Sequence, residues 1–228
     1  KHYHFHQGWL ETRHHFSFSD YYDPTNMNWG ALRVFNDDSI APASGFPPHA
    51  HKDMEIITYV LEGELHHQDS MGNEGKILPN EIQVMSAGKG IVHAEENPHP
   101  NKALKLLQMW LVPNQKNLTP RWEQRKFSPH EWKNKLFCAV SGKKDTHANA
   151  LFIHQDGDFY ISQLDKGKST VHETKSERAI YLFVLSGEIR VNGKEMHARD
   201  SAKIKNEEKV EITAETNAHF VFWDCVDV

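Results

Sequence analysis

Two short histidine-containing pairs, about forty residues apart, constrain this chain more than any other feature of its sequence. The first is His49-Ala-His51, four residues after Gly45, and the second is His93-Ala-Glu95, shortly after a glycine-rich loop. In a β-strand, residues i and i+2 point to the same face and their Cα atoms lie roughly 7 Å apart. Each pair can therefore present two ligands to one ion, and two facing strands would supply four. We predict a metal site made of His49, His51, His93 and Glu95.

The ligand types narrow the class of metal. Three imidazoles and one carboxylate suit a divalent transition metal such as iron, nickel, copper, zinc or manganese. Four protein ligands leave an octahedral ion two open positions, whereas structural zinc is usually tetrahedral with every position filled and with cysteine among its ligands. The site is therefore expected to bind substrate together with water or dioxygen.

Glu55 is the alternative to Glu95 as the fourth ligand. It has the same parity as His51, but four residues of straight strand would place it roughly 13 Å further along. Glu95 follows His93 by two residues, which suits a shared ion. We predict that Glu95 is the ligand, and that Glu55 is either a hydrogen-bonding partner behind the ligands or a solvated strand residue.

The residues around the two pairs follow a recognisable pattern. A glycine precedes the first pair, a glutamate and a glycine follow it, and a glycine and an asparagine flank the second: Gly45, Glu55, Gly63, Gly90 and Asn97. Longer stretches, such as residues 45–56, 68–73 and 85–95, add to the match. This pattern resembles the cupin superfamily and, within it, the pirin family over residues 6–127. The short chain is similar to the bacterial pirins that cleave quercetin.

The resemblance implies a flavonol 2,3-dioxygenase. Glu95 would be both ligand and catalytic base, taking the proton of the flavonol 3-hydroxyl; dioxygen would then add, the heterocycle would open and carbon monoxide would leave. Fe(II) is the expected metal, with nickel, copper, manganese and zinc as alternatives. Some pirins are described as partners of transcription regulators, so the alternative function is an iron-dependent redox-sensing regulator that binds a protein partner. Another cupin reaction is a third hypothesis, because fold alone does not settle chemistry.

An internal repeat predicts two domains. Residues 55–65 align with residues 179–189 at an offset of 124, and short strands separated by turns indicate a sandwich or barrel. We predict an all-β bicupin fold of two antiparallel β-barrel (jelly-roll) domains packed together. Residues 1–135 would form the metal-binding cupin domain, and residues 136–228 a cupin domain without metal ligands. The offset places Glu173 and Lys175 opposite the first pair, and Asn217 and His219 opposite the second.

Several local features carry further expectations. Residues 31–35 predict a strand, ended by the turn formers Asn36, Asp37 and Asp38. The neighbouring histidines at 14–15 are expected to be structural, and those at 66–67 to have a surface or core role, with an approach to the metal site as the alternative. The candidates for the apolar wall of the pocket are Phe46, Met54, Ile57 and Met85.

Composition excludes some classes of protein. A net charge of −5 and an isoelectric point near 6.4 argue against direct nucleic-acid binding, which usually requires a basic surface. No apolar run approaches the roughly 18 residues of a membrane span, and no secretory signal is visible. Cys138 and Cys225 are far apart and are expected to be buried free thiols in a reducing compartment. We expect a cytoplasmic monomer.

Overall fold

The structure is a computed structural model that describes residues 2–228, and nearly all of its regular structure is β-strand. A single 3₁₀ turn, Pro129–Glu131, lies among the described residues and carries a capping box formed by Ser128 and Glu131. The chain divides into two compact units. The second unit comprises Trp29–Ala31, Ser128–Phe152 and Asp156–Val228, and the first contains the remainder. The all-β, two-domain fold is confirmed, while the boundary between residues 135 and 136 stays a prediction.

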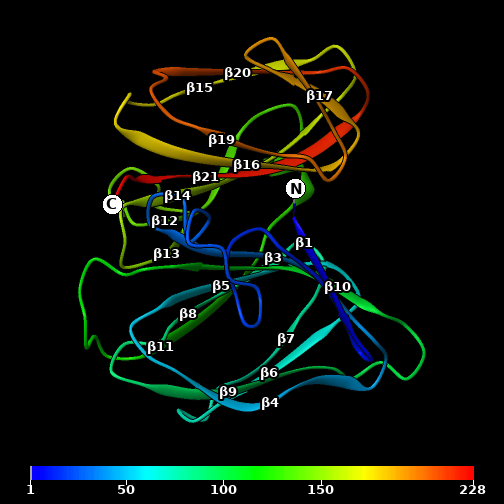
Figure 1. Ribbon diagram of the computed structural model, residues 1–228, viewed down its shortest axis with the longest axis vertical. Helices are drawn as coiled ribbons and strands as arrows, with labels where there is room; N and C mark the ends of the chain where they lie inside the picture. The colour runs from blue at the N-terminus through cyan, green and yellow to red at the C-terminus, as the bar shows by residue number, and fades with distance from the viewer. Residues whose placement is uncertain (1) are drawn as a thin grey trace. The chain divides into compact units, whose positions relative to one another are not determined.

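Two antiparallel sheets, seen as two layers in Figure 1, form the first unit. The larger sheet has the order β1 (Tyr3–Gln7), β2 (Leu10–His14), β3 (Leu32–Ile40), β10 (Leu104–Leu111), β5 (Glu55–Glu62), β8 (Glu81–Ser86), β11 (Arg121–Lys126). The smaller sheet has the order β4 (Ser44–His51), β9 (Ile91–Asn97), β6 (Leu65–Asp69), β7 (Glu74–Ile77).

The strands of the first unit follow the burial expected of a two-layer sandwich. Strand β5 is buried along most of its length, which matches its continuous apolar sequence. Strand β9 instead alternates buried and exposed residues, so that His93, Glu95 and Asn97 face inward while Val92 is 42% exposed. This period of two places the polar residues of β9 between the two sheets.

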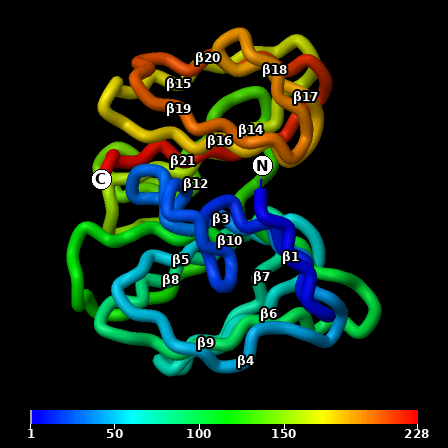
Figure 2. The backbone as a smooth tube through the Cα atoms, in the orientation of Figure 1, coloured from blue at the N-terminus to red at the C-terminus, as the bar shows by residue number. Residues whose placement is uncertain are grey.

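The second unit repeats this strand order. Its larger sheet runs β13 (Leu151–Phe152), β12 (Phe137–Ser141), β14 (Gly157–Leu164), β21 (Ala218–Val226), β16 (Arg178–Ser186), β19 (Ser201–Ile204). Its smaller sheet runs β15 (Ser169–Glu173), β20 (Lys209–Ala214), β17 (Glu188–Val191), β18 (Lys194–His197), as the yellow-to-red part of the tube in Figure 2 shows. In the larger sheet, the counterparts of β3, β10, β5 and β8 are β14, β21, β16 and β19, in that order. The duplication inferred from one aligned segment therefore extends over both sheets.

One part of the repeat alignment was wrong. By strand order, β20 is the counterpart of β9, whereas His219 lies on β21, the counterpart of β10. Asn217 precedes β21 in a turn. The error arose because the strands and turns between the aligned block and this point are shorter in the second unit. The inward residues of β20 are apolar (Val210, Ile212 and Ala214), so this strand offers no counterpart of His93 or Glu95.

The predicted turn at residues 36–38 is also wrong. Strand β3 continues through Asn36, Asp37 and Asp38 to Ile40, and all three polar side chains are at most 5% exposed. Strands β2 and β10 pair with β3 on either side across these residues. Pairing on both edges satisfies the backbone of these residues and overrides their preference for turns.

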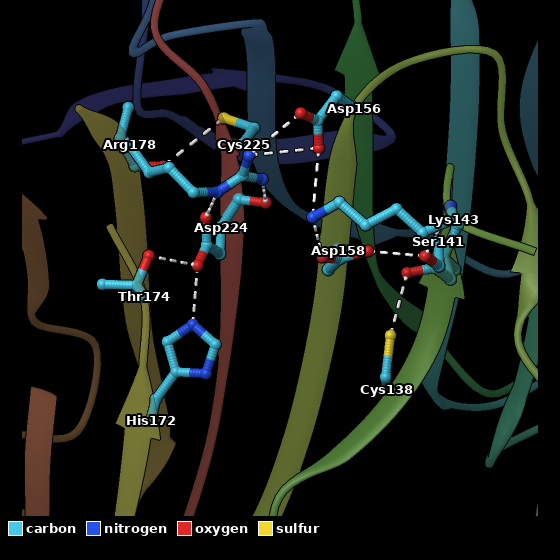
Figure 3. Close-up of polar contacts among 12 residues, drawn as sticks. Cys138, Ser141, Lys143, Asp156, Asp158, His172, Thr174, Arg178, Asp224 and Cys225 are labelled. Carbon is cyan, nitrogen blue, oxygen red and sulfur yellow. Dashed lines mark hydrogen bonds and ion pairs between the residues drawn. The ribbon is translucent and has the colours of Figure 1, made fainter. Parts of the chain in front are cut away.

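A buried polar network crosses the two sheets of the second unit (Figure 3). The Asp224 carboxylate accepts hydrogen bonds from Arg178, from the Thr174 hydroxyl at 2.7 Å and from the His172 ring at 2.6 Å. Arg178 also donates to both oxygens of Asp156 at 3.1 Å. Burial alone would raise the pKa of Asp224, but these hydrogen bonds outweigh it and lower that pKa below its ordinary value.

Replacing Arg178 should test this network. Arg178→Leu leaves the buried Asp224 charge without its main partner, so we expect the free energy of unfolding to fall by about 3–5 kcal/mol. The matched control is Lys205→Ala, which removes a partly exposed pair with Asp227 and should cost below about 1 kcal/mol. Urea unfolding at pH 7 measures both, and equal effects would contradict the prediction. Because the pKa of Asp224 is lowered in the folded state, its contribution should disappear as the pH falls below about 4.

Candidate metal centre

Pairing between β4 and β9 brings three of the predicted ligands together. His49 lies opposite His93 and His51 lies opposite Ile91, after a bulge between Phe46 and His49. One ring nitrogen from each histidine lies within 4.8 Å of the other two. The ring centroids of His49 and His93 are 4.4 Å apart, and that of His51 lies 4.8 Å and 4.9 Å from them. Three imidazoles therefore converge on one point between the sheets.

The electrostatics of these histidines suit metal ligation. Burial, followed by the proximity of His49, lowers the pKa of His51 to about 4, and burial with three neighbouring histidines lowers that of His93 further. Neutral imidazoles keep the lone pair that a metal requires. The buried Nε2 of His93 has no hydrogen-bond partner in the protein. His49 Nδ1 lies 2.8 Å from the carbonyl oxygen of Pro47, an orienting contact typical of metal-bound histidines. The residues therefore fit a divalent transition metal.

Glu95, the fourth predicted ligand, lines the same pocket, but its carboxylate clusters with His93 and His67 and not with His49 and His51. Its carboxylate accepts hydrogen bonds from Gln108 at 2.8 Å and from the Thr58 hydroxyl at 3.4 Å. A carboxylate oxygen lies within 4.8 Å of ring nitrogens of His93 and His67. Burial raises the pKa of Glu95 to about 7, although the hydrogen bonds oppose that rise. Glu95 can therefore serve as a metal ligand or as a proton acceptor in a dry site.

Glu55, the alternative carboxylate, points elsewhere. It is 1% exposed, and its carboxylate accepts hydrogen bonds from the Ser86 hydroxyl at 2.8 Å and from the His154 backbone at 3.1 Å. The pocket that holds the three histidines is lined by Glu95 and not by Glu55. Glu55 is thus a buried residue that is hydrogen-bonded to Ser86 on β8 and to the backbone of His154, and not a solvated strand residue.

Two residues of this site were not predicted as members of it. His67 was expected to have a surface or core role, with an approach to the metal site as the alternative; it is fully buried on β6 and its ring centroid lies 5.3 Å from that of His93. The alternation of β6, which buries Leu65 and His67 and leaves His66 between them half-buried, is the signal that could have found it. Gln108 on β10 carried no such signal, because its neighbours are apolar on both sides.

A second polar group, here called the polar wall, consists of His14, Asn36 and Asp38 and lines the same pocket. Each is at most 5% exposed, and each has a side-chain atom without a hydrogen-bond partner in the protein: His14 Nδ1, Asn36 Oδ1 and Asp38 Oδ1. Burial first, and then the charges of Asp37 and Glu95, raise the pKa of Asp38 to about 7. Unpartnered buried polar atoms cost about 1–3 kcal/mol each, which indicates a binding role.

The apolar lining of the pocket differs from the one expected. Of the four candidates, Phe46 lines it, and the other apolar contributors are Leu10, Phe18, Ile56 and Trp110. Met54 and Met85 do not line it and instead pack in an adjoining hydrophobic cluster that shares Ile56 with the pocket. The pocket therefore combines imidazole and carboxyl groups with apolar side chains, so it can hold an ion next to an apolar surface.

Gly45 sets the distance between the two ligand strands. A Cβ atom on this residue would lie 2.3 Å from the Glu95 carbonyl oxygen and 2.4 Å from the Glu96 Cα atom. Real Cβ atoms do not approach backbone so closely, so β4 and β9 could not keep this spacing with any other residue at position 45. The glycine of the motif thus serves the ligand geometry directly.

Comparisons with known proteins agree with the fold. A family model described as Pirin matches residues 1–111, and one described as the quercetinase C-terminal cupin domain matches residues 139–225. A pirin-like protein of Caulobacter vibrioides is 46% identical over 95% of this chain and 93% of its own length. The quercetin 2,3-dioxygenase of Escherichia coli K12 is 41% identical over 97% of this chain and 94% of its own length. Among solved structures, the bacterial pirin YhhW of Escherichia coli in complex with nickel(II) matches this chain with a TM-score of 0.93 and 40% sequence identity. The match covers 100% of this chain and 96% of that protein's chain.

Duplicated sandwich units with a histidine-rich pocket in the first define a two-domain cupin protein. The identity over almost the whole chain then narrows this class: the chain belongs to the pirin family. Several of its relatives carry the name quercetin 2,3-dioxygenase, in most cases as a putative one. Among the residues that the structure describes, no helix has the length and apolar character needed to cross a membrane.

Substitution of Gly45 should disturb the ligand strands. Gly45→Ala forces β4 away from β9, so we expect the free energy of unfolding to fall by about 1–3 kcal/mol, with weaker metal binding. Ala50→Ser, on the exposed side of the same strand, is the control and should stay within about 0.5 kcal/mol of the parent. Urea unfolding of the metal-free proteins and calorimetric titration with a divalent metal measure the two effects. A Gly45→Ala protein with parental stability and metal affinity would show that the close approach is unimportant.

Proposed function

We propose that this protein is a metal-dependent dioxygenase that opens the heterocycle of quercetin-like flavonols and releases carbon monoxide. The observation that carries the proposal is the convergence of three imidazoles in a partly apolar pocket that is also lined by a buried glutamate. The names of the relatives support the same reaction class. The proposed ligands are His49, His51, His93 and Glu95, and the proposed metal is Fe(II). Nickel is the first alternative, because a structure of a related pirin contains it.

The proposed role of Glu95 is to move one proton. The flavonol 3-hydroxyl would lie against its carboxylate, which takes the hydroxyl proton and leaves an electron-rich enolate. Gln108 and Thr58 hold the carboxylate in place through their hydrogen bonds. In the metal-free protein, burial raises the pKa of Glu95, which favours proton uptake by its carboxylate.

The remaining residues would bind and protect the substrate. The ion, once bound, would polarise the deprotonated hydroxyl and allow electrons to pass between flavonol and dioxygen. The polar wall offers partners for further hydroxyl groups of the flavonol, and Phe46 and Trp110 exclude water from its ring edges. The reaction consumes one flavonol and one dioxygen, and yields one depside and one carbon monoxide.

Metal-dependent turnover is the first test. Purified protein, reconstituted in turn with iron, nickel, copper and manganese, should consume quercetin aerobically and release carbon monoxide. His51→Ala should lose metal and turnover together, and Glu95→Gln should lower turnover by about 100-fold or more because it removes the base. His66→Ala, a neighbouring histidine paired with Glu64 outside the pocket, is the control and should leave turnover unchanged.

The outcome also separates the alternative function. Absence of turnover with every metal, in protein that binds the ion, would reject the dioxygenase and favour an iron-dependent redox-sensing regulator with a protein partner. No contact in the described residues points to such a partner. A cytoplasmic location and a monomeric state stay predictions alongside it.

Removal of a polar-wall carboxyl should separate substrate binding from stability. Asp38 has a buried carboxyl oxygen without a hydrogen-bond partner, and Asp38→Leu puts an apolar side chain in its place. The free energy of unfolding should therefore stay the same or rise. The KM for quercetin should rise by roughly 10-fold to 100-fold, which corresponds to the loss of one hydrogen bond. Steady-state kinetics and urea unfolding check the two parts. A destabilised variant with unchanged KM would assign Asp38 a purely structural role.

A further inference from the structure

We propose that the second unit contains a metal site of its own, formed by Cys138, His147 and Asp158 and suited to a zinc-like divalent ion. One thiol sulfur, one imidazole nitrogen and one carboxylate oxygen from these residues lie within 4.8 Å of one another. The ring nitrogens of the three histidines in the first unit lie within the same distance of one another. Sulfur, nitrogen and oxygen in one cluster are the donor types that zinc accepts.

Strand pairing and one loop create this cluster. Strands β12 and β14 are antiparallel neighbours, with Cys138 opposite Tyr160 and Ser141 opposite Asp158. The ladder shifts register between Cys138 and Val140, which is the sign of a bulge. Bulges re-aim side chains and are common beside functional sites. His147 belongs to the turns between β12 and β13, and its ring meets the ring of Tyr160 edge to face at 6.1 Å.

The Asp158 carboxylate is already held in a fixed orientation, as Figure 3 shows. Its Oδ1 accepts a hydrogen bond from the Ser141 hydroxyl at 2.5 Å, and its Oδ2 accepts one from Lys143 Nζ at 2.8 Å. Each carboxylate oxygen has two lone pairs, so each keeps one for an ion. Hydrogen-bonded carboxylates of this kind are usual among metal ligands.

The charges balance when a divalent cation binds. Lys143 also pairs with Asp156 at 3.1 Å, so that its positive charge is matched without Asp158. A thiolate from Cys138 and the carboxylate of Asp158 then carry two negative charges against the two positive charges of the ion. Burial, and then the charge of Asp158, raise the pKa of Cys138, so metal binding would release the thiol proton to solvent.

Access to the cluster comes from a pocket within the second unit. His147 and Asp158 line it together with Tyr160, and its volume is about 430 Å³. A water molecule needs only a small part of that space. Three protein ligands with water in the fourth position is the arrangement of catalytic rather than structural zinc sites.

This site is distinct from the cupin positions of the second unit. Those positions lie on β15 and β20, and β20 presents only apolar side chains to the interior. The sequence prediction was a C-terminal domain without metal ligands, and the proposed site departs from that prediction, because Cys138 and Asp158 lie on the other sheet. The first unit's candidate ligands include no sulfur, which gives the second site a spectroscopic signature of its own.

Cobalt(II) titration of the reduced, metal-free, full-length protein tests the proposal. Binding at the second site should produce a thiolate-to-cobalt charge-transfer band in the near ultraviolet, which saturates with one ion per chain. Cys138→Ser should abolish the band. The matched control is Cys225→Ser, which should keep it, because the Cys225 thiol is buried against the backbone oxygens of Ala179 and Trp29. Ser141→Ala should weaken cobalt affinity at this site by roughly 10-fold to 100-fold.

Two further outcomes would overturn the proposal: no thiolate band in the parent protein, or a band that survives in Cys138→Ser. His147→Ala is a second test in case Cys138→Ser does not fold, because His147 lies in a partly exposed turn. The thiolate band of His147→Ala should be weaker than that of the parent at equal cobalt concentration. An unchanged titration would also reject the site. The readout does not depend on flavonol turnover, so failure of the dioxygenase proposal would leave it unaffected.

Discussion

The close pairing of β4 with β9 is the constraint on which the candidate centre depends. It places His49 opposite His93, and it is permitted because Gly45 has no Cβ atom to meet the Glu95 carbonyl. Everything else in the first unit supports that pairing: the apolar strand β5 fills the interior behind it, and Gln108 holds Glu95 from the facing sheet. A metal geometry accurate to fractions of an ångström thus rests on a backbone contact rather than on the ligands themselves.

Much of this arrangement is readable from the sequence, because the side-chain period of a strand is two and the motif spacing is short. The shared face of His49 and His51, and that of His93 and Glu95, follow from those facts, whereas the pairing of the two strands was expected from the resemblance to the family. Residues that reach the pocket from strands distant in sequence, such as Gln108 and His67, could not be placed in the same way. Their positions depend on which strands become neighbours, and single-strand patterns do not contain the order of strands in a sheet.

The largest error of sequence interpretation is itself informative. Asn36, Asp37 and Asp38 have the composition of a turn, yet they form the middle of a buried strand. Tertiary pairing overrides local preference there, and the protein retains polar groups in a place where valine or isoleucine would be more stable. Conflicts between local preference and global fold tend to mark functional positions. In the second unit, the inward residues of β20 are apolar, whereas its counterpart β9 in the first unit carries a histidine and a glutamate. Buried polar residues are thus confined to the copy of the strand that carries candidate ligands.

The polar wall also has a thermodynamic consequence. A ligand whose hydroxyl groups meet His14, Asn36 and Asp38 gains hydrogen bonds that these atoms lack within the protein. These polar contacts add to the apolar contacts with residues such as Phe46 and Trp110. The heat of binding should therefore be more favourable than the apolar lining alone would give. The molecule would recognise its ligand partly through enthalpy, despite the apolar lining of its pocket.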